Sequence, residues 1–308
     1  MKEHMQEHIR TAIGIAAVER ETRLSKDVLR VWERRYGFPA PARDVHGERV
    51  YTPEQVERLC LIRRLMDMGR RPGALVGLDT DALARLLAQA APAAIASTGV
   101  AVDPDLLDAL LMPIKAHDPG RFHDALRRQL AVQGLQAFVE FTLAPLTVEV
   151  GLRWEDGRFA VFEEHLYTEV VQRVLRQAIG GLPSVRGDPV ILLTSLPGEE
   201  HVLGLLMAEA LFSLEGAACV AIGAGTPALE IARAVSAYRA DVVALSCSAA
   251  YPARRLAAEV AQLRELLPEP VALWAGGAGY ARLDGIAGVL GLPTLADGRR
   301  ALQCWRMR

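Results

Sequence analysis

The segment Val190–Gly204 reads VILLTSLPGEEHVLG and decides the fold of the second half of the chain. Its first seven residues form an apolar run typical of a strand buried on both faces. A Pro-Gly turn follows, and a histidine then stands at the beginning of an apolar helical pattern. Because open α/β sheets bind ligands at the carboxyl ends of their strands, His201 is predicted to lie at a binding edge.

The same alternation of strand and helix continues to the end of the chain. VILLTSL, ACVAIG, DVVALSCS and VALWAGG read as strands, and longer helical patterns separate them. This order predicts a doubly wound parallel sheet over residues 185–308. The carboxyl ends of its strands carry Glu199 to Gly204, Ser246 to Ser248, and Gly276 with Gly277, so these residues should converge on one edge.

The loop after the first strand lacks both G-x-G-x-x-G and G-x-x-x-x-G-K-[ST], which argues against dinucleotides and nucleoside triphosphates. It offers a histidine with a carboxylate two residues before it and a glycine three residues after it. An imidazole ligates metals well, a carboxylate can orient it through its other nitrogen, and a glycine admits a bulky ligand. On these residues alone, a metal ligand and an ordinary surface histidine at a helix start both stay open.

The middle of the chain, residues 81–184, shows apolar residues at three- and four-residue spacing throughout, which predicts a helical bundle. Such stripes are explained by packing among the helices. Trp154, at the end of one helical run, and the pair Glu164-His165, at the start of the next, are the exceptions that suggest a site.

Residues 1–80 are predicted to form short helices and a basic ribbon. One helix covers Ile13 to Arg20, Ser25 caps a second that stops near Gly37, and Thr52 caps a third with Pro53 at its first position and Gln55 completing a capping box. Between the last two, His46-Gly47 suggests the tip of a ribbon.

Residues 1–75 contain 15 Lys and Arg against 11 Asp and Glu, whereas the rest of the chain has an excess of acidic residues. An arginine-bearing second helix followed by a basic ribbon makes a winged helix-turn-helix that suits double-stranded DNA. The alternative from the residues alone is a solvated basic surface.

The run VLRVWERRYGFPAPARDVHGERVYTPEQVERL resembles the DNA-binding domain of MerR-type transcription regulators, over roughly residues 11–75. VERETRLS, between the first two helices, is more charged than the usual pattern. The resemblance implies that the head reads promoter DNA, with contacts from Lys26, Arg30, Arg34, Arg35, Arg43, His46, Arg49 and Tyr51.

The strand-end residues resemble the cobalamin-binding domain of methionine synthase and related proteins, over about 120 residues. That resemblance implies His201 as the lower axial ligand of cobalt and Glu199 as its hydrogen-bonded partner. Gly204, Ser246, Ser248, Gly276 and Gly277 would line the groove for the displaced benzimidazole tail. The family usually has Asp in place of Glu199 and a larger apolar residue in place of Ser248.

Trp154, nine intervening residues and Glu164-His165 match the W-x9-E-H motif of cobalamin-dependent light-responsive repressors of the CarH and LitR type. In that family the tryptophan covers the upper face of the corrin and the Glu-His pair holds the upper ligand region. The well-studied members have a histidine directly after the tryptophan, where this chain has Glu155. The resemblance therefore leaves open whether the chain senses light, cobalamin itself or another tetrapyrrole.

The leading hypothesis is a cytoplasmic transcription repressor that binds adenosylcobalamin and changes between oligomeric states, as a dimer or tetramer. The start MKEHMQEHIR is too polar for a signal peptide, no apolar run reaches the roughly 18 residues of a membrane helix, and the four cysteines form no C-x-x-C pair. Two alternatives remain, a corrinoid-carrying enzyme subunit and a regulator whose corrinoid domain is an unliganded interaction module. Two observations argue against an enzyme. The chain has a predicted DNA-binding head, and the three predicted segments leave no residues for a catalytic domain.

Overall fold

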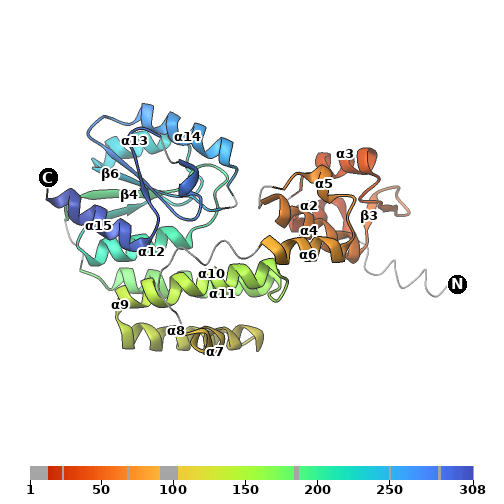
Figure 1. Cartoon of the computed structure of the whole chain (residues 1–308), viewed down its shortest axis with the longest axis horizontal. Coiled ribbons are helices and arrows are strands. Elements are labelled where there is room, and N and C mark those ends of the chain that lie inside the picture. The colour runs from red at the N-terminus through yellow and green to blue at the C-terminus, as the bar shows by residue number, and fades with distance from the viewer. Residues whose placement is uncertain are drawn as a thin grey trace. The chain divides into compact units, whose positions relative to one another are not determined.

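The structure is a computed structural model that describes residues 13–22, 24–67, 70–90, 103–183, 187–249, 251–283 and 286–307. It contains two compact units, Met1–Pro92 and Ala93–Arg308 (Figure 1). We describe each unit by itself, and call them the head and the C-terminal unit.

The head begins with two short helices. α2 (Ile15–Thr22) is followed by α3 (Lys26–Tyr36). Ser25 caps α3 as predicted, because its Oγ accepts the Val28 N–H at 3.3 Å. Gly37 ends α3 with φ of 69°, a left-handed conformation that glycine adopts without strain.

A small antiparallel sheet of order β1-β3-β2 completes the winged helix-turn-helix. β2 (Ala42–Arg43) and β3 (Arg49–Tyr51) form the predicted ribbon with its tip near Gly47, whose φ is 78°. The predicted first helix was wrong at its start, since Ile13–Gly14 is strand β1 and pairs with β3. Two residues carry too little pattern to reveal a strand.

α4 (Pro53–Asp67) begins at Pro53 as predicted, and the Gln55 N–H reaches Thr52 Oγ1 at 3.3 Å. The capping box is not completed as predicted, because the Gln55 side-chain amide instead donates to the Ala40 carbonyl at 2.7 Å. Gln55 thus ties α4 to the segment that precedes the ribbon.

Two further helices, α5 (Pro72–Leu75) and α6 (Thr80–Ala90), close the head. Leu83 of α6 is fully buried in one core with Leu29, Trp32 and Leu59. The sequence boundary near residue 80 therefore falls just where a helix begins that packs with the head.

The C-terminal unit begins with the predicted bundle. Its long helices are α7 (Pro104–Lys115), α8 (Pro119–Gln133), α10 (Ala144–Glu155) and α11 (Val161–Gly180). The run 135–154 is helical throughout, but its hydrogen bonding is not uniform: a short α9 (Leu135–Ala137) leads into a π-helical element, η3 (Phe138–Leu143), and then into α10. Pro145 follows directly after this element, and a proline has no N–H for the regular α-helical hydrogen bond.

Among the described residues, the stretch Leu135–Glu155 is long and apolar enough to cross a membrane by composition, with a mean hydropathy of 1.3. Four of its apolar side chains are fully buried in the core of the bundle, namely Phe138, Val139, Leu143 and Leu146, whereas Phe141 is exposed.

The sheet follows the bundle with parallel strands in the order β5-β4-β6-β7-β8. The strands are β4 (Val190–Thr194), β5 (Ala218–Ala221), β6 (Val242–Ser246), β7 (Ala272–Gly276) and β8 (Val289–Leu292). The first four match the predicted strands, while β8 was not predicted. The strand order reverses between β4 and β6, the point at which such sheets bind ligands.

Helices cover both faces of this sheet (Figure 1). α13 (Ala228–Tyr238) and α14 (Ala253–Leu266) pack on one face, and η4 (Tyr280–Leu283) precedes β8. α12 (Leu203–Leu214) and the C-terminal α15 (Leu295–Arg306) pack on the other.

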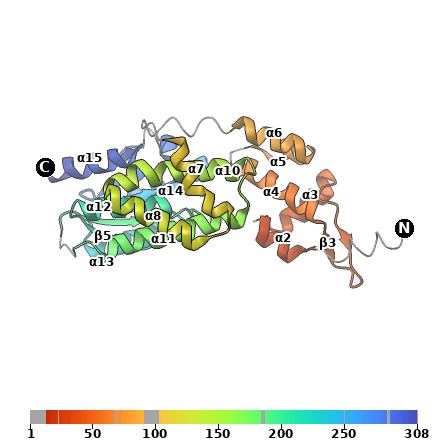
Figure 2. The same cartoon turned by 90° about the horizontal axis from the view of Figure 1, so that it is seen from below.

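α12 lies between the sheet and the bundle. Leu205 and Phe212 are buried with the sheet, whereas Leu206, Met207 and Leu211 are buried with the bundle helices. Figure 2 views the unit from the bundle side, and α12 contacts α9, η3 and α11 of the bundle. The residues directly before α12 therefore lie at the edge where the sheet meets the bundle.

Candidate cobalamin site and DNA-binding surface

The loop between β4 and α12 holds the histidine that the sequence singles out. Glu199 is buried at 2% exposure, and its Oε1 accepts hydrogen bonds from His201 Nδ1 at 2.6 Å and from the His201 backbone N–H at 3.1 Å. The other oxygen, Oε2, accepts the Ser248 N–H at 2.7 Å. The Glu199 carboxylate therefore fixes the imidazole of His201 and joins the loop after β4 to the loop after β6.

These contacts also keep the carboxylate ionised. Burial by itself raises the pKa of the Glu199 carboxyl, but the hydrogen bonds from His201 and Ser248 outweigh burial and lower that pKa below its ordinary value. An ionised Glu199 holds the proton of the imidazole on Nδ1, so Nε2 is the nitrogen with a lone pair for a metal. The His201 side chain is 64% exposed.

The glycines of the motif lie where backbone and side chains approach closely. A Cβ at Gly204 would meet Ser246 Oγ at 3.0 Å, so a side chain there would crowd the end of β6. Gly277 has φ of 91°, and a Cβ there would lie 2.5 Å from the Cys247 carbonyl oxygen. Gly276 pairs with Ser246 in the parallel register between β6 and β7. Gly204 and Gly277 therefore let the loops at this edge of the sheet pack more closely than a side chain would allow.

Sequence reasoning missed residues that hold this loop in place. Ser195 Oγ donates to the Glu199 carbonyl at 2.7 Å and accepts the Gly225 N–H at 3.0 Å. Its neighbour Thr194 donates to the Gly223 carbonyl at 2.8 Å. The sequence did contain a signal for these two residues, since Thr194 and Ser195 are hydroxyl residues at the end of an otherwise apolar strand.

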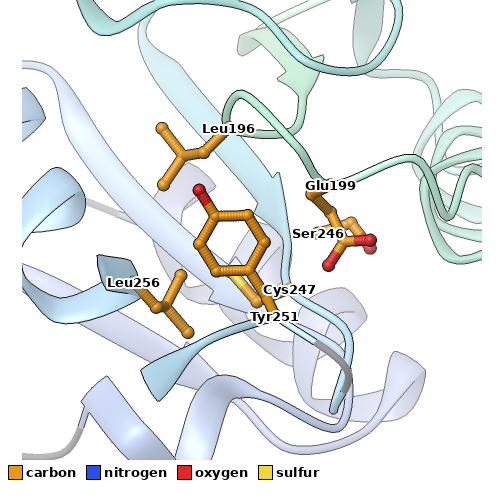
Figure 3. A pocket seen from close by; sticks show the side chains of 6 residues that line it. All are labelled: Leu196, Glu199, Ser246, Cys247, Tyr251 and Leu256. Carbon is orange, nitrogen blue, oxygen red and sulfur yellow. The ribbon is translucent and has the colours of Figure 1, made fainter. Parts of the chain in front are cut away.

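Tyr251 was also missed. Its hydroxyl donates to the Pro197 carbonyl at 2.8 Å and lies 2.8 Å from Glu259 Oε2. Figure 3 shows its ring with Leu196 and Leu256 on one side and Glu199 and Ser246 on the other. The remaining gap between these side chains is too narrow for a water molecule.

The bundle presents the other predicted cofactor residues on α10 and α11. Trp154 is half-buried and packs against the bundle core, and Glu155 follows it as the last residue of α10. Glu164 accepts a hydrogen bond from Thr168 Oγ1 at 2.8 Å, and its carboxylate lies 3.7 Å from His165 Nε2. The His165 side chain is 62% exposed.

In the head, α3 and the ribbon bring the predicted arginines together. Arg30, Arg34 and Arg49 line one surface hollow, with Asp27 and Val31 beside them. Arg30 lies 3.4 Å from Asp27, while Arg49 forms an ion pair with Glu33, Nε to Oε2, at 2.8 Å.

The remaining predicted DNA contacts do not line this hollow. Lys26 Nζ lies 3.7 Å from Glu19, and Arg35 is exposed with its guanidinium 5.3 Å from the centre of the Tyr36 ring. In the ribbon Arg43 donates to the Gly47 carbonyl at 2.7 Å, and His46 is exposed.

Tyr51 departs from the expected surface position. Its side chain is 1% exposed and packs in the head core with Trp32 and Val56. Residues two apart in a strand lie on the same face, so Tyr51 shares a face of β3 with Arg49, which is itself half-buried against Glu33 of α3. That face of β3 packs against the head, and Tyr51 is its most buried residue. Tyr51 is therefore a core residue of the head. The predicted DNA-contacting residues that remain at the surface are the basic residues and His46.

Comparisons with known proteins agree with both regions. Residues 14–78 match the MerR HTH family regulatory protein family, and residues 106–179, which are the bundle helices, match the B12 binding domain family. The chain is 34% identical to the HTH-type transcriptional repressor CarH of Myxococcus xanthus over 258 residues, which covers 82% of this chain and 84% of that protein. It is 29% identical to the HTH-type transcriptional repressor CarA of the same organism over 272 residues, covering 87% of each chain.

Among solved structures, the monomethylamine corrinoid protein of Methanosarcina barkeri matches with a TM-score of 0.53 at 15% identity, over 65% of this chain and 99% of that chain. At that identity the likeness concerns the fold alone, a helical bundle joined to a parallel sheet. The repressor relatives, by contrast, match across most of the chain. With its MerR head and its B12-binding domain, the chain belongs to the family of HTH-type transcriptional repressors that includes CarH and CarA.

Proposed function

We propose that this chain is a repressor that binds promoter DNA through its head and adenosylcobalamin through its C-terminal unit, and that the bound cofactor controls its oligomeric state. In this proposal His201 would ligate cobalt on one side. Trp154, Glu164 and His165 would contact the opposite side, and the nucleotide tail would be held by Gly204, Ser246, Ser248, Gly276 and Gly277.

The observation that carries the proposal is the bond between His201 Nδ1 and the buried carboxylate of Glu199. A histidine that only covers a surface requires no buried, ionised carboxylate behind it, since burying that charge has a cost. Ligating histidines commonly donate their second nitrogen to a carboxylate. The corrin ring supplies four nitrogen ligands itself, so one histidine is enough, and the described residues contain no cluster of three or more metal-ligating side chains.

The residues of the chain would bind and orient the cofactor. Adenosylcobalamin supplies a cobalt–carbon bond that light can break. Glu199 sets the direction of the imidazole and keeps its proton away from cobalt. Glycine at positions 204 and 277 lets the loops that would hold the tail pack closely against Ser246 and Cys247.

Binding at the edge between sheet and bundle would act on assembly through a difference in affinity between oligomeric states. A symmetric oligomer places two heads on pseudo-palindromic or repeated half-sites, which is how a small DNA-reading head gains affinity. A regulator of this kind acts on chromosomal DNA, so we assign it to the cytoplasm and assign it no catalytic activity.

The competing function is a regulator whose corrinoid domain holds no ligand. Purified protein incubated in the dark with adenosylcobalamin distinguishes the two, because a bound corrinoid gives a visible spectrum that survives gel filtration. Light scattering and DNA retardation on the same fractions, with and without cofactor, then test control of assembly and DNA binding. A colourless protein whose DNA binding ignores the cofactor would leave only the interaction module.

A further inference from the structure

The nine residues between Trp154 and Glu164, which we call the spacer, are held by several hydrogen bonds and by one buried ring. The Phe159 N–H donates to the Arg153 carbonyl at 2.7 Å, and the Phe159 side chain is 1% exposed. The loop thus turns back onto the end of α10 before α11 begins, with one aromatic ring inserted in the bundle core.

A lysine from another helix joins both ends of this turn. Lys115, the last residue of α7, donates through Nζ to the Arg158 carbonyl at 3.0 Å and to the Glu163 carboxylate at 2.9 Å. Glu163 is 2% exposed and also accepts the Ala160 N–H at 2.8 Å, which caps the first turn of α11. We call Lys115 and Glu163 the spacer clamp.

Two cations flank the inserted ring. Lys115 Nζ lies 5.4 Å from the centre of the Phe159 ring, and the guanidinium of Arg153 lies 5.9 Å from it. Arg153 also pairs with Glu149, one turn earlier on α10, at 2.7 Å, and with Asp108 of α7. The spacer is therefore fixed to α7, α10 and α11 together.

An ion pair with a half-exposed cation adds little to stability. Lys115 is 46% exposed, so stability alone is a weak reason for the arrangement. Its geometric effect is larger, because a single ammonium group fixes the separation of acceptors five residues apart in the chain. These acceptors lie between Trp154 and the adjacent pair Glu164-His165.

We propose that Lys115 and Glu163 are positioning residues that hold Trp154 at a fixed spacing from Glu164-His165, and thereby make the protein prefer cobalamins with a bulky upper ligand. This inference rests on the proposed placement of these three residues at the upper face. Loss of the clamp lets the spacer relax and removes the preference, while the lower ligand His201 is untouched.

The test measures dissociation constants for adenosylcobalamin and hydroxocobalamin by equilibrium dialysis in the dark. Lys115→Met and Glu163→Gln should each weaken adenosylcobalamin binding about tenfold, at the lower end of what loss of an outer-shell partner costs, and leave hydroxocobalamin binding within about twofold. Lys115→Arg keeps a cation that can reach both acceptors and should restore the preference.

The matched control is Arg233→Met, which removes an exposed cation paired with Glu230 at 2.6 Å on α13, away from the bundle. It should change neither constant. Circular dichroism and the urea midpoint of the cofactor-free variants report folding separately, and Glu163→Gln, which keeps an acceptor for the Ala160 N–H, provides the measurement if Lys115→Met does not fold.

Several results would overturn the inference. An equal loss of both cobalamins, or no loss of either, in Lys115→Met and Glu163→Gln refutes positioning. A parent protein that binds both cobalamins with equal affinity refutes the preference but leaves the proposed function intact. A parent that binds neither removes the proposed function and the inference together.

Discussion

Glu33 of α3 and Arg49 of β3 form an ion pair, Oε2 to Nε at 2.8 Å, that joins the helix expected in the DNA groove to the wing beside it. The contact raises the pKa of Arg49, chiefly through its hydrogen bond to Glu33, so the guanidinium keeps its charge. The side chain of Arg49 is therefore already oriented by Glu33, whereas Arg34, one residue beyond Glu33, is exposed.

The first prediction concerns DNA affinity. Arg34→Ala should weaken binding to all sequences and reduce the salt slope by about one unit, as expected for one lost phosphate contact. Combined with Arg49→Ala it should nearly abolish retardation of promoter DNA. Arg121→Ala, an exposed arginine on α8, is the control and should bind like the parent. Parent-like binding by the double variant across salt concentrations contradicts the assignment of this surface.

The second prediction concerns the lower ligand. His201→Ala should lose about 10- to 100-fold in cobalamin affinity and change the visible spectrum, because the imidazole is removed from cobalt. Glu199→Gln should weaken binding less and keep the parent spectrum, since the amide oxygen can still accept from one of its two present donors, His201 or Ser248. Equilibrium dialysis with a visible spectrum measures both. An unchanged spectrum and affinity in His201→Ala rules out axial ligation by this residue.

The third prediction concerns light. Bound adenosylcobalamin should still lose its upper group on illumination, because the photolysis belongs to the cofactor. With Glu155 at the position where the light-responsive family has histidine, the lit protein should not form a stable bis-imidazole complex. Water, Glu155 or His165 should occupy the emptied position, and an oxygen donor gives a different spectrum from an imidazole.

The measurement compares the parent with Glu155→His before and after illumination, by visible spectrum and molecular mass. Glu155→His should acquire the bis-imidazole spectrum that the parent lacks. If the parent already shows that spectrum and His165→Ala leaves it unchanged, another histidine has taken this role.

The fourth prediction concerns the backbone at the sheet edge. Gly277→Ala should destabilise the cofactor-free protein by about 2 kcal/mol, because the alanine would adopt a φ of 91° with its Cβ 2.5 Å from a carbonyl oxygen. Gly151→Ala in α10 is the control: a Cβ there meets nothing within 4 Å, so helix propensity should make it neutral or stabilising by up to about 1 kcal/mol. Urea unfolding measures both, and equal midpoints would contradict the argument.

The features that the sequence predicted well are local ones. Ser25 and Gly37 bound α3 because a cap depends on residues within one turn. Strands β4, β6 and β7 were predicted because they are apolar and buried on both faces, and β5, at the sheet edge, because it is apolar although only partly buried. The pairing of Glu199 with His201 also lies within three residues.

The features that were missed depend on distant partners. Strand β1 exists only because β3 offers an edge to pair with, and Gln55 turns away from Thr52 because the Ala40 carbonyl is within reach. Tyr51 is buried because α3 and α4 supply Trp32 and Val56 to the same core, which the sequence of the ribbon alone does not reveal. The spacer clamp joins Lys115 to a glutamate 48 residues later, a separation at which no pattern in the sequence indicates a contact.

α12 belongs to two cores at once, with Leu206 and Met207 on the bundle side and Leu205 and Phe212 on the sheet side. Neither core can lose its order while the other stays intact, because each would have to expose one face of the same helix to water. The bundle and the sheet should therefore melt as one cooperative transition despite their different architectures. A ligand that binds at the sheet edge next to His201 should therefore raise the melting temperature of the bundle helices and of the sheet by the same amount.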